Sequence, residues 1–280
     1  MTLIQKLNTF ISFKIIGRKR TRGLIEKLSN SVSLNLLDIA HHEMGIASYG
    51  SFSEKSEAFV IEKYLKEYFN GQKSKDLIFF DIGANVGNYS QSLYNQFRDA
   101  TIFSFEPNPA SFEKIYKRFL SIHNIKVVQA GLGSVASVLS LYSYNTDKAS
   151  EHASVYKNVM EDLHQSKDLV AFEVDIVTLD AYCTENNILQ IDFLKIDTEG
   201  FELEVLKGAS QLIMENKIKI IQFEFNEMNV YSRVFLKDFY TILKNYTFYR
   251  LMENDLKPMG FYNPKNEIFR YQNILAISND

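Results

Sequence analysis

Four acidic residues follow short apolar runs in the middle and later parts of the sequence. These runs end at Asp81, Glu106, Asp197 and Glu224. If the runs are parallel strands, their carboxyl ends meet at one edge of a sheet, which is where ligands bind in such folds. Carboxylates brought together must be balanced by a cation, a donor-rich ligand or a metal. The pattern therefore predicts a polar binding site at this edge.

The first acidic residue opens a glycine-containing loop with the pattern D-x-G-x-x-x-G. In this loop Gly83 and Gly87 permit positive φ angles and close approach of a ligand, and Asn85 lies between them. A nicotinamide-binding loop normally has the pattern G-x-G-x-x-G, with a helix end facing a pyrophosphate. Asp81 would repel a pyrophosphate, whereas it suits a cofactor with a cationic amino-acid tail. Glu106 stands where an acidic side chain accepts hydrogen bonds from ribose hydroxyls.

A lysine interrupts the apolar run that ends at Asp197. Strand alternation places Lys195 and Asp197 on the same side of that strand. A structural interpretation is a buried ion pair that compensates Asp197 or Glu224, and a functional one is a pocket lined by these groups. The two interpretations do not exclude each other. Glu199 and Glu202 follow at a predicted helix start, where acidic residues also stabilise the helix.

The surrounding pattern predicts an α/β protein with a doubly wound parallel sheet. Short apolar runs, typical of buried strands, alternate with amphipathic helical stretches. The predicted strands are 77–80, 101–105, 125–128, 193–196 and 218–223, and the predicted helices are 54–70, 87–97, 109–122, 201–216 and 232–244. Two further strands are predicted at 138–142 and 169–177. The polar stretch 144–168 between them is expected to form a mobile loop over the site.

The motifs resemble those of the FkbM family of methyltransferases. They are the FxDIGANVGxxS-like stretch from Phe80 to Ser90, FSFEPNP from Phe103 to Pro109, VTLDAY from Val177 to Tyr182 and the LKIDxEGxExxVLxGA-like stretch from Leu194 to Ala209. The resemblance covers about residues 77–226. Several ordered motifs at suitable spacing are far more specific than the glycine loop alone.

This resemblance implies a Rossmann-like class I methyltransferase fold whose seven-stranded, mostly parallel sheet includes a C-terminal antiparallel pair. Residues 247–251 and 271–277 are the candidates for that pair. It also implies S-adenosylmethionine as cofactor and O-methylation of a hydroxyl on a sugar, glycan precursor or other natural product. The residues matching the cofactor-binding positions of the family are Asp81, Gly83, Asn85, Gly87 and Glu106.

Two positions depart from the family pattern. Asn226 stands where many members have a histidine, shortly after the acidic residue that ends the fifth strand. The third strand is followed by 129–131, Gln-Ala-Gly, without the acidic residue that often contacts adenine in related methyltransferases. The adenine contact is therefore left open by the sequence.

Methyl transfer to a hydroxyl requires alignment of the reacting groups and removal of a proton. The catalytic candidates are Asp197, Glu199, Lys195 and Glu224, and we favour Asp197 as base because it ends the fourth strand. Weaker candidates for the base are His123 and His152. Asp197, Glu199 and Glu224 could instead hold magnesium or calcium through their oxygens, but Lys195 already supplies positive charge. We therefore predict no metal.

The 280 residues indicate one large α/β domain with an extension, which we place at residues 1–70, followed by the methyltransferase domain at 71–280. The net charge is -3, but residues 1–30 are strongly basic. Such a segment is a helix packed on the domain or a peripheral membrane contact. The single cysteine, Cys183, fits a reducing compartment. We expect a cytoplasmic protein without a secretory signal or membrane span, which takes a small-molecule or glycan acceptor and whose oligomeric state stays open.

Three alternatives remain from the sequence. A nicotinamide-dependent oxidoreductase would share the Rossmann-like fold, although the loop spacing argues against it. A cofactor-binding subunit without turnover, within a glycan-assembly complex, would have the same glycine loop. A nucleic-acid methyltransferase is disfavoured, because no segment resembles the N-P-P-Y motif that holds a flipped base and the body of the chain is acidic.

Overall fold

The computed structural model describes residues 20, 22–25, 27, 36–46, 51–144, 153–163 and 169–279. By its internal contacts the chain divides into two units, Met1–Met44 and Gly45–Asp280. The described part of the first unit includes helix α3 (Leu36–His42). Most of the basic segment at residues 1–30 lies outside the described residues. Within the described ranges, no helix is both long and apolar enough to cross a membrane.

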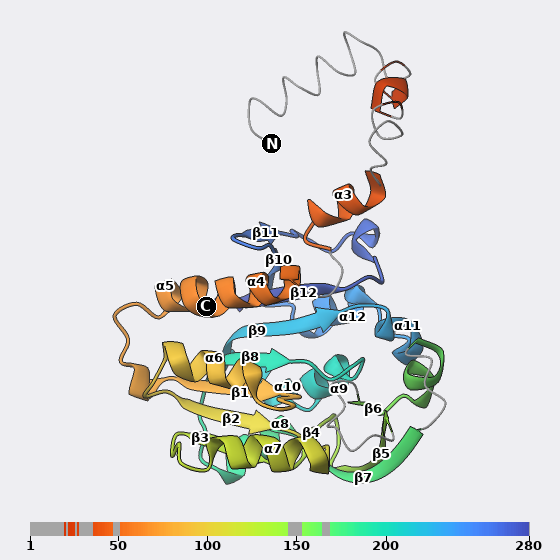
Figure 1. Cartoon of the computed structure of the whole chain (residues 1–280). Coiled ribbons are helices and arrows are strands. Elements are labelled where there is room, and N and C mark those ends of the chain that lie inside the picture. Colours follow the sequence, from red (N-terminus) through yellow and green to blue (C-terminus); the bar gives the residue numbers. More distant parts are fainter. Residues whose placement is uncertain are drawn as a thin grey trace. The chain divides into compact units, whose positions relative to one another are not determined.

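The second unit is built on a large mixed sheet (Figure 1). Its strand order is β11-β10-β12-β9-β8-β1-β2-β3. The strands from β9 to β3 in this order are parallel, whereas β12 is antiparallel to both of its neighbours. The bounds are β1 Ile78–Ile82, β2 Thr101–Phe105, β3 Ile125–Val128, β8 Ile191–Ile196, β9 Ile218–Phe225, β10 Tyr246–Leu251, β11 Leu256–Pro258 and β12 Gln272–Ser278.

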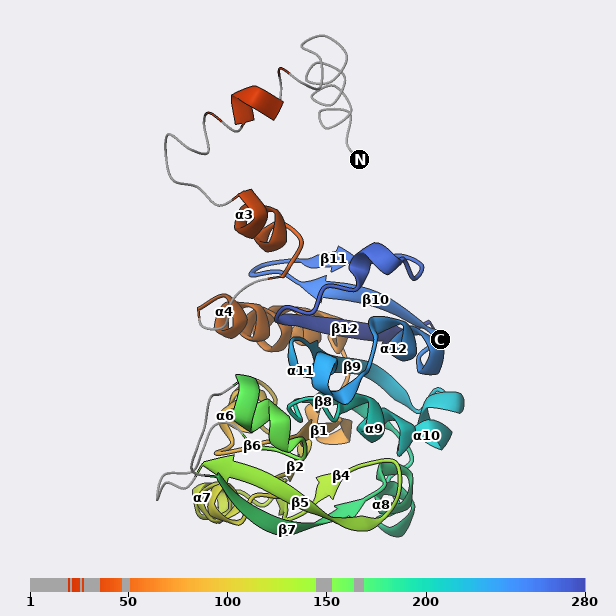
Figure 2. The same ribbon diagram turned by 90° about the vertical axis from the view of Figure 1, so that its right-hand side faces the viewer.

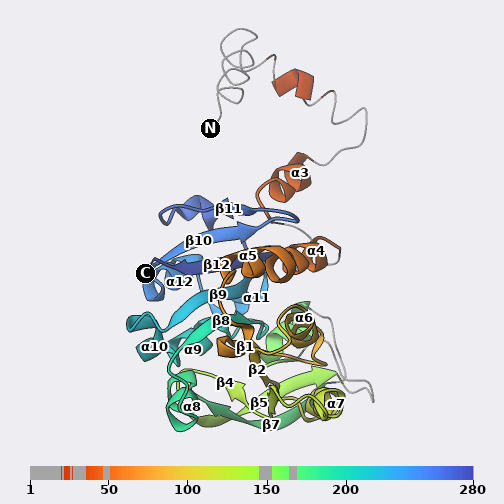
Figure 3. The same cartoon turned by 90° about the vertical axis from the view of Figure 1, so that its left-hand side faces the viewer.

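Helices cover both faces of this sheet because its strands carry apolar side chains on each side. Phe79 of β1 packs with one set of helices and Phe80 with the other. The first set, which lies on the right of the sheet in Figure 3, contains α4 (Ser51–Phe59), η2 (Val60–Leu65), α5 (Lys66–Tyr68), α6 (Asn88–Gln96) and α7 (Pro109–Phe119). The second set contains α8 (Leu179–Glu185), α9 (Glu202–Lys207), α10 (Ser210–Met214) and α12 (Leu236–Ile242).

A second, smaller sheet has the strand order β4-β7-β5-β6 (green in Figure 2). Its strands are β4 (Gly131–Leu132), β5 (Ser137–Tyr144), β6 (Ala153–Ser154) and β7 (Leu169–Val177). The predicted strands at 138–142 and 169–177 are therefore confirmed, and they pair with each other in antiparallel register. The expectation of a continuous loop over 144–168 was wrong, because β6 and the helix η4 (Val159–Leu163) lie inside it. Residues 145–152 and 164–168 lie outside the described residues.

The predicted doubly wound sheet and its C-terminal antiparallel pair are confirmed. The segments proposed for the pair correspond to β10 and β12. The sheet has eight strands rather than seven among the described residues, since β11 pairs with β10 at the edge. The predicted helix 201–216 is two helices, α9 and α10, separated by Gly208 and Ala209. Gly208 packs closely, since a Cβ there would be 2.0 Å from the Gly133 carbonyl oxygen.

The helical run at 51–68 packs into the core of the second unit. Val60, Ile61 and Leu65 are buried in the same apolar cluster as strand residues such as Phe79 and Phe193. Contacts thus divide the chain at Met44, whereas the sequence analysis placed the boundary after residue 70. The physical reason is the apolar face of this helix, which has to be covered by the sheet. The assignment of residues 1–70 as an extension stays a prediction.

Candidate active site

The loop after β1 brings the ends of β1, β2 and β8 together. Gly83 has a φ of 78°, and its N–H donates to the Phe105 carbonyl at 3.0 Å. A Cβ at Gly83 would lie 1.8 Å from the Asp197 carbonyl oxygen. Gly87 begins α6 with a φ of 82°, and a Cβ there would lie 2.5 Å from the Phe119 ring. Both glycines are therefore required by backbone shape and by close packing.

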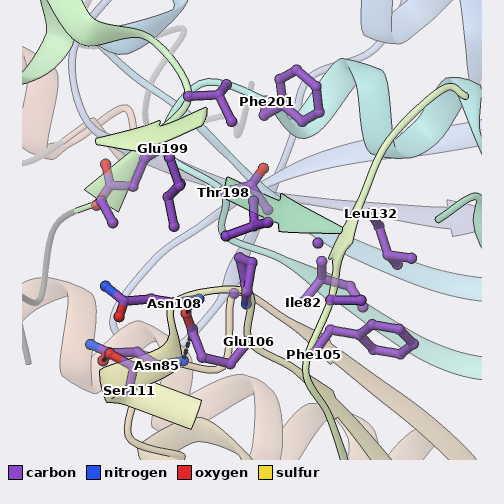
Figure 4. Close-up of a pocket in the computed structure, with 18 of the residues that line it drawn as sticks. Ile82, Asn85, Phe105, Glu106, Asn108, Ser111, Leu132, Thr198, Glu199 and Phe201 are labelled. Carbon is purple, nitrogen blue, oxygen red and sulfur yellow. Dashed lines mark hydrogen bonds between the residues drawn. The ribbon is translucent and has the colours of Figure 1, made fainter. Parts of the chain in front are cut away.

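Glu106 is buried beside this loop and is held by backbone donors. Its Oε2 accepts a hydrogen bond from the Asn85 N–H at 2.7 Å, and its Oε1 accepts one from the Asn108 N–H at 2.8 Å. Ser111 donates to the Asn85 side chain at 3.1 Å, which fixes the loop to α7. Burial raises the pKa of Glu106 to about 7, although the two backbone donors oppose this. Figure 4 shows these residues on one side of a cleft.

The cleft encloses about 820 Å³ of space, part of it continuous with solvent. Glu106, Asn85 and Ser111 form its polar side. Its other walls include apolar side chains from three parts of the chain: Ile82 and Phe105 at the ends of β1 and β2, Leu132, Leu141, Val155, Val174 and Ile176 in and next to the small sheet, and Phe201.

The small sheet thus supplies a wall that the sequence analysis missed. Val174 and Leu141 are each 5% exposed, and both line the cleft. The signal was the alternation of apolar residues in the two predicted strands. That alternation identified a strand face but not what the face covers. An apolar wall offers a flat heterocycle such as adenine dispersion contacts without an acidic partner.

Asp81 lies beneath the cleft rather than in its lining. Its side chain is fully buried, and Ser90 donates to Oδ2 at 2.6 Å. Its Oδ1 is buried without a hydrogen-bond partner among the described residues. Asp81 pairs in strand register with Lys195 of β8. Burial raises the pKa of Asp81, and Lys195 lowers it. Gly87 is also absent from the lining, so of the predicted cofactor residues Gly83, Asn85 and Glu106 border the cleft.

Lys195 forms the ion pair that the sequence analysis considered. Its Nζ lies 2.9 Å from Asp197 Oδ2 and 4.6 Å from the centre of the Tyr89 ring. Burial lowers the pKa of Lys195, but Asp197, Glu57 and Asp81 more than offset this and hold it well above its usual range. The lysine is therefore charged. The Asp197 side chain is 30% exposed and lines the cleft, so the ion pair and the pocket are both present.

The turn after Asp197 also borders the cleft. Thr198 and Glu199 line it, and Glu199 and Gly200 both have positive φ, 54° and 100°. Glu202 fixes this turn, because its Oε1 accepts hydrogen bonds from the Thr198 and Gly200 N–H groups, each at 3.0 Å. Burial raises the pKa of Glu202 to about 7, against these donors. Glu202 therefore has a structural function here, whereas Glu199 faces the pocket (Figure 4).

Glu224 is the last residue but one of β9, and it does not line the cleft. It is 8% exposed, and Asn226 donates to its Oε2 at 3.2 Å. Burial raises its pKa well above the usual range, and Asp197 and Glu199 raise it further. Asn226, which replaces the histidine of many family members, also accepts a hydrogen bond from the Met228 N–H at 2.9 Å at the start of α11 (Met228–Ser232).

The histidine candidates do not join the cluster. His123 is exposed and stands just before β3, at the amino end of a parallel strand and therefore at the sheet edge opposite the cleft. His152 lies outside the described residues. No group of three or more His, Cys, Asp or Glu residues within the described ranges is arranged to hold a metal ion.

One acidic residue of the cluster was missed by the sequence analysis. Glu57 of α4 is partly buried, and its carboxylate interacts electrostatically with Lys195, Asp197 and Asp81. Burial raises the pKa of Glu57 to about 7, and Lys195 lowers it. The sequence offered only a charged residue on an amphipathic helix, which is most often a solvated position.

The strand order and the antiparallel β12 define the class I methyltransferase arrangement, with the cleft at the carboxyl ends of β1, β2 and β8. A family model described as the methyltransferase FkbM domain matches residues 81–249. The chain therefore belongs to the FkbM methyltransferase family, and the resemblance seen in its motifs is confirmed.

Three relatives show the range of similarity. "Methyltransferase 1" of Beauveria bassiana is 30% identical over 152 residues, which are 48% of this chain and 58% of the relative. "2-O-methyltransferase NoeI" of Sinorhizobium fredii is 20% identical, over 56% of this chain and 66% of the relative. "Hexuronic acid methyltransferase AglP" of Haloferax volcanii is 23% identical, over 60% and 62%. The chain spans about three fifths of the length of the first relatives.

The residues present fit S-adenosylmethionine, the cofactor of this class of domain. Glu106 would accept hydrogen bonds from ribose hydroxyls, and the apolar wall would cover the adenine. The buried Asp81 Oδ1 has no hydrogen-bond partner among the described residues, and this leaves an acceptor below the loop that suits the ammonium group of a methionine tail. The domain is thus an S-adenosylmethionine-dependent methyltransferase domain, and the cofactor prediction is confirmed at that level.

Proposed function

We propose that this protein transfers a methyl group from S-adenosylmethionine to a hydroxyl of a sugar, glycan precursor or related natural product. The observation that carries the proposal is the position of Asp197. Its carboxylate lines the cofactor cleft and is also held at 2.9 Å by the buried Lys195. A carboxylate fixed between a cofactor cleft and a polar cluster is suited to orient an acceptor hydroxyl.

The cofactor supplies a methyl group bound to a sulfonium, and the chain supplies alignment and a proton acceptor. Asp197 accepts the hydrogen bond of the acceptor hydroxyl, directs the oxygen toward the cleft and takes the proton. Lys195 positions Asp197, and Tyr89 supports the lysine through its ring. Glu224 is the alternative proton acceptor, since burial and the neighbouring carboxylates raise its pKa.

The names of two relatives support a hydroxyl of a sugar as the acceptor. One is described as a 2-O-methyltransferase and the other as a hexuronic acid methyltransferase. Both align with this chain over more than half of its length. The carboxylates around Asp197 are suited to accept hydrogen bonds from a polyol.

The first test is calorimetric titration of the full-length protein with S-adenosylhomocysteine, together with the Asp81→Ala and Glu106→Ala variants. We expect binding in the micromolar range that both variants weaken. Transfer of a labelled methyl group to a panel of methyl glycosides then tests the acceptor class. Binding of NAD instead of S-adenosylhomocysteine would favour the oxidoreductase alternative. Binding without transfer to any acceptor would favour a subunit that lacks turnover.

We further propose a cytoplasmic location with peripheral membrane contact through the basic residues 1–30. An acceptor linked to a lipid or phosphate would be held near an anionic surface by such a segment. Deletion of these residues should reduce both co-sedimentation with anionic vesicles and activity toward a lipid-linked acceptor. Unchanged values for both would contradict the proposal.

A further inference from the structure

The turn at residues 198–200, which follows β8, has an unfavourable backbone conformation. Glu199 has a φ of 54° and Gly200 a φ of 100°. Positive φ is strained in any residue that carries a Cβ, so Glu199 has to be held by contacts from the surrounding structure. The Glu202 carboxylate bonds the N–H groups of Thr198 and Gly200. A carboxylate cannot donate a hydrogen bond, so the Glu199 carbonyl group needs a different partner.

A buried serine of β6 bonds that carbonyl group. Ser154 Oγ donates to the Glu199 carbonyl oxygen at 2.9 Å and accepts from the Tyr156 N–H at 3.1 Å. The second bond occupies a lone pair of the hydroxyl and directs its hydrogen toward the carbonyl oxygen. Ser154 is only 1% exposed, so water has little access to take the place of its hydroxyl.

The serine lies on a segment, residues 153–163, that is anchored independently of the turn. Ser154 stands opposite Tyr142 in the antiparallel pairing of β6 with β5. Further along the segment, Val159 and Met160 of η4 are fully buried, and η4 lies against α11. Because the segment has its own attachments, it can fix the turn rather than follow its movements.

Tyr156 joins the same segment to the turn through its ring. The ring centre lies 6.2 Å from that of Phe201, and its Cδ2 atom would be 3.6 Å from a Cβ on Gly200. Phe201, Thr198 and Glu199 all line the cofactor cleft, and Figure 4 shows them around it. The contacts between the segment and the turn are therefore made at the wall of the cleft.

We propose that Ser154 is a positioning residue of the methyltransferase site. It holds the turn at residues 198–200 in its strained conformation and thereby keeps Thr198 and Glu199 in the wall of the cofactor cleft. Methyl transfer depends on close alignment of the bound groups, which a displaced wall would disturb. The inference rests on the proposed function only through its cofactor, so it holds whichever acceptor receives the methyl group.

The test is calorimetric titration of the full-length protein with S-adenosylhomocysteine, which needs no turnover. We expect Ser154→Ala to raise the Kd about tenfold, because the turn then leaves its strained conformation. Ser154→Thr keeps the hydroxyl and should bind within about threefold of the unchanged protein.

Ser56→Ala is the matched control. Ser56 is also 1% exposed, and its Oγ donates to the Ser53 carbonyl oxygen at 2.9 Å, but it lies in α4 and does not line the cleft. This variant loses the same kind of hydrogen bond, and it should bind S-adenosylhomocysteine within about twofold of the unchanged protein. An equal loss of affinity in Ser56→Ala and Ser154→Ala would overturn the proposal.

A double-mutant cycle tests whether Ser154 acts through the strained turn. Asparagine adopts positive φ more readily than glutamate. In the Glu199→Asn background, Ser154→Ala should therefore raise the Kd by about threefold or less, whereas a serine with a merely structural role would keep its full effect.

Four results would overturn the proposal: an unfolded Ser154→Ala variant by circular dichroism, a Kd within about twofold of the unchanged protein, a Ser154→Thr variant as weak as Ser154→Ala, or equal effects in both backgrounds of the cycle. Absence of S-adenosylhomocysteine binding by the unchanged protein would instead contradict the cofactor assignment on which the proposed function depends.

Discussion

The two halves of the site are built in different ways. The cofactor cleft is shaped by backbone: glycines at a tight approach, N–H groups that hold Glu106, and apolar walls. The cluster around Lys195 is made of charged and polar side chains from several elements. A backbone-shaped site suits a ligand that is always the same, because its form is fixed by few residues. A side-chain cluster suits an acceptor that differs between relatives, since single substitutions can change it.

The largest expected effect on stability and cofactor binding comes from Gly83→Ala, which changes the half of the site that is shaped by backbone. A Cβ at 1.8 Å from the Asp197 carbonyl oxygen forces β1 and β8 apart, and the φ of 78° adds strain. We expect a loss of about 3 kcal/mol or more in unfolding free energy and no binding of S-adenosylhomocysteine.

Gly71→Ala is the matched control, because Gly71 has a φ of 86° with nothing within 4 Å of a Cβ. It should cost about 1 kcal/mol and leave binding unchanged. Thermal unfolding and calorimetry measure both.

On the acceptor side, Asp197→Asn should lower kcat by about 10² to 10⁴ while the Kd of S-adenosylhomocysteine changes little, because the base is lost and the cleft remains. Asp192→Asn is its control on the same strand. Asp192 pairs with Lys219 at 2.7 Å and accepts from the Ile78 N–H at 2.8 Å at the opposite end of β8. That variant should lose stability but keep kcat. If Glu224→Gln abolishes transfer and Asp197→Asn does not, the base is Glu224.

The cleft should show a pH dependence that originates in Glu106. Its pKa of about 7 in the free protein means that it is largely protonated below pH 7, whereas ribose hydroxyls bind best to the charged form. The Kd of S-adenosylhomocysteine should therefore fall as pH rises, by up to about tenfold per unit below pH 7, and level off above it. Glu106→Gln should raise the Kd about tenfold and remove this slope. A slope that persists in this variant would assign the titration to another group, such as Asp81, whose pKa is also raised by burial.

The raised pKa of Glu106 also affects the stability of the protein without ligand, and here a higher pH is unfavourable. Because the folded protein holds the proton on Glu106 more tightly than the unfolded chain does, its contribution to unfolding free energy falls as pH rises from about 4.5 to about 7. Glu57 and Glu202 have the same sign and the same approximate pKa. Denaturant titrations of Glu106→Gln across this range should show a shallower decline. If the unfolding free energy of this variant declines as steeply as that of the unchanged protein, Glu106 does not contribute to the pH dependence.

The smallest effect concerns the apolar wall. Val174→Ala removes contact area from the cleft and should raise the Kd of S-adenosylhomocysteine about fivefold, equivalent to about 1 kcal/mol. Val138 lies on the same small sheet, but its side chain is 58% exposed. The control Val138→Ala should therefore leave the Kd of S-adenosylhomocysteine unchanged. Equal Kd values for the two variants would mean that this sheet does not cover the bound nucleoside.

The cofactor half was largely predictable because its signals are local. Gly83, Gly87 and the acidic residues after apolar runs lie in short stretches whose geometry follows from strand and helix rules. The acceptor half was predictable only where it shares those stretches, as at Lys195 and Asp197. Glu57 carries no such signal, since a glutamate on an amphipathic helix is ordinarily solvated. The apolar wall formed by β5 and β7 could not be predicted either, because the alternation of apolar and polar residues shows that a strand has a buried face but not what that face packs against.

By itself the sequence determined the alternation of the main parallel strands with helices, the glycine loop, and the strand on which Lys195 and Asp197 share a side, because period and backbone conformation are local properties of the chain. It also identified the methyltransferase family through those same stretches. Tertiary structure alone decided that Asp81 is buried beneath the cleft, that the small sheet closes it, and that the Glu57 carboxylate interacts electrostatically with Lys195. These are contacts between residues distant in sequence, and they are set by how the helices and the small sheet pack against the main sheet.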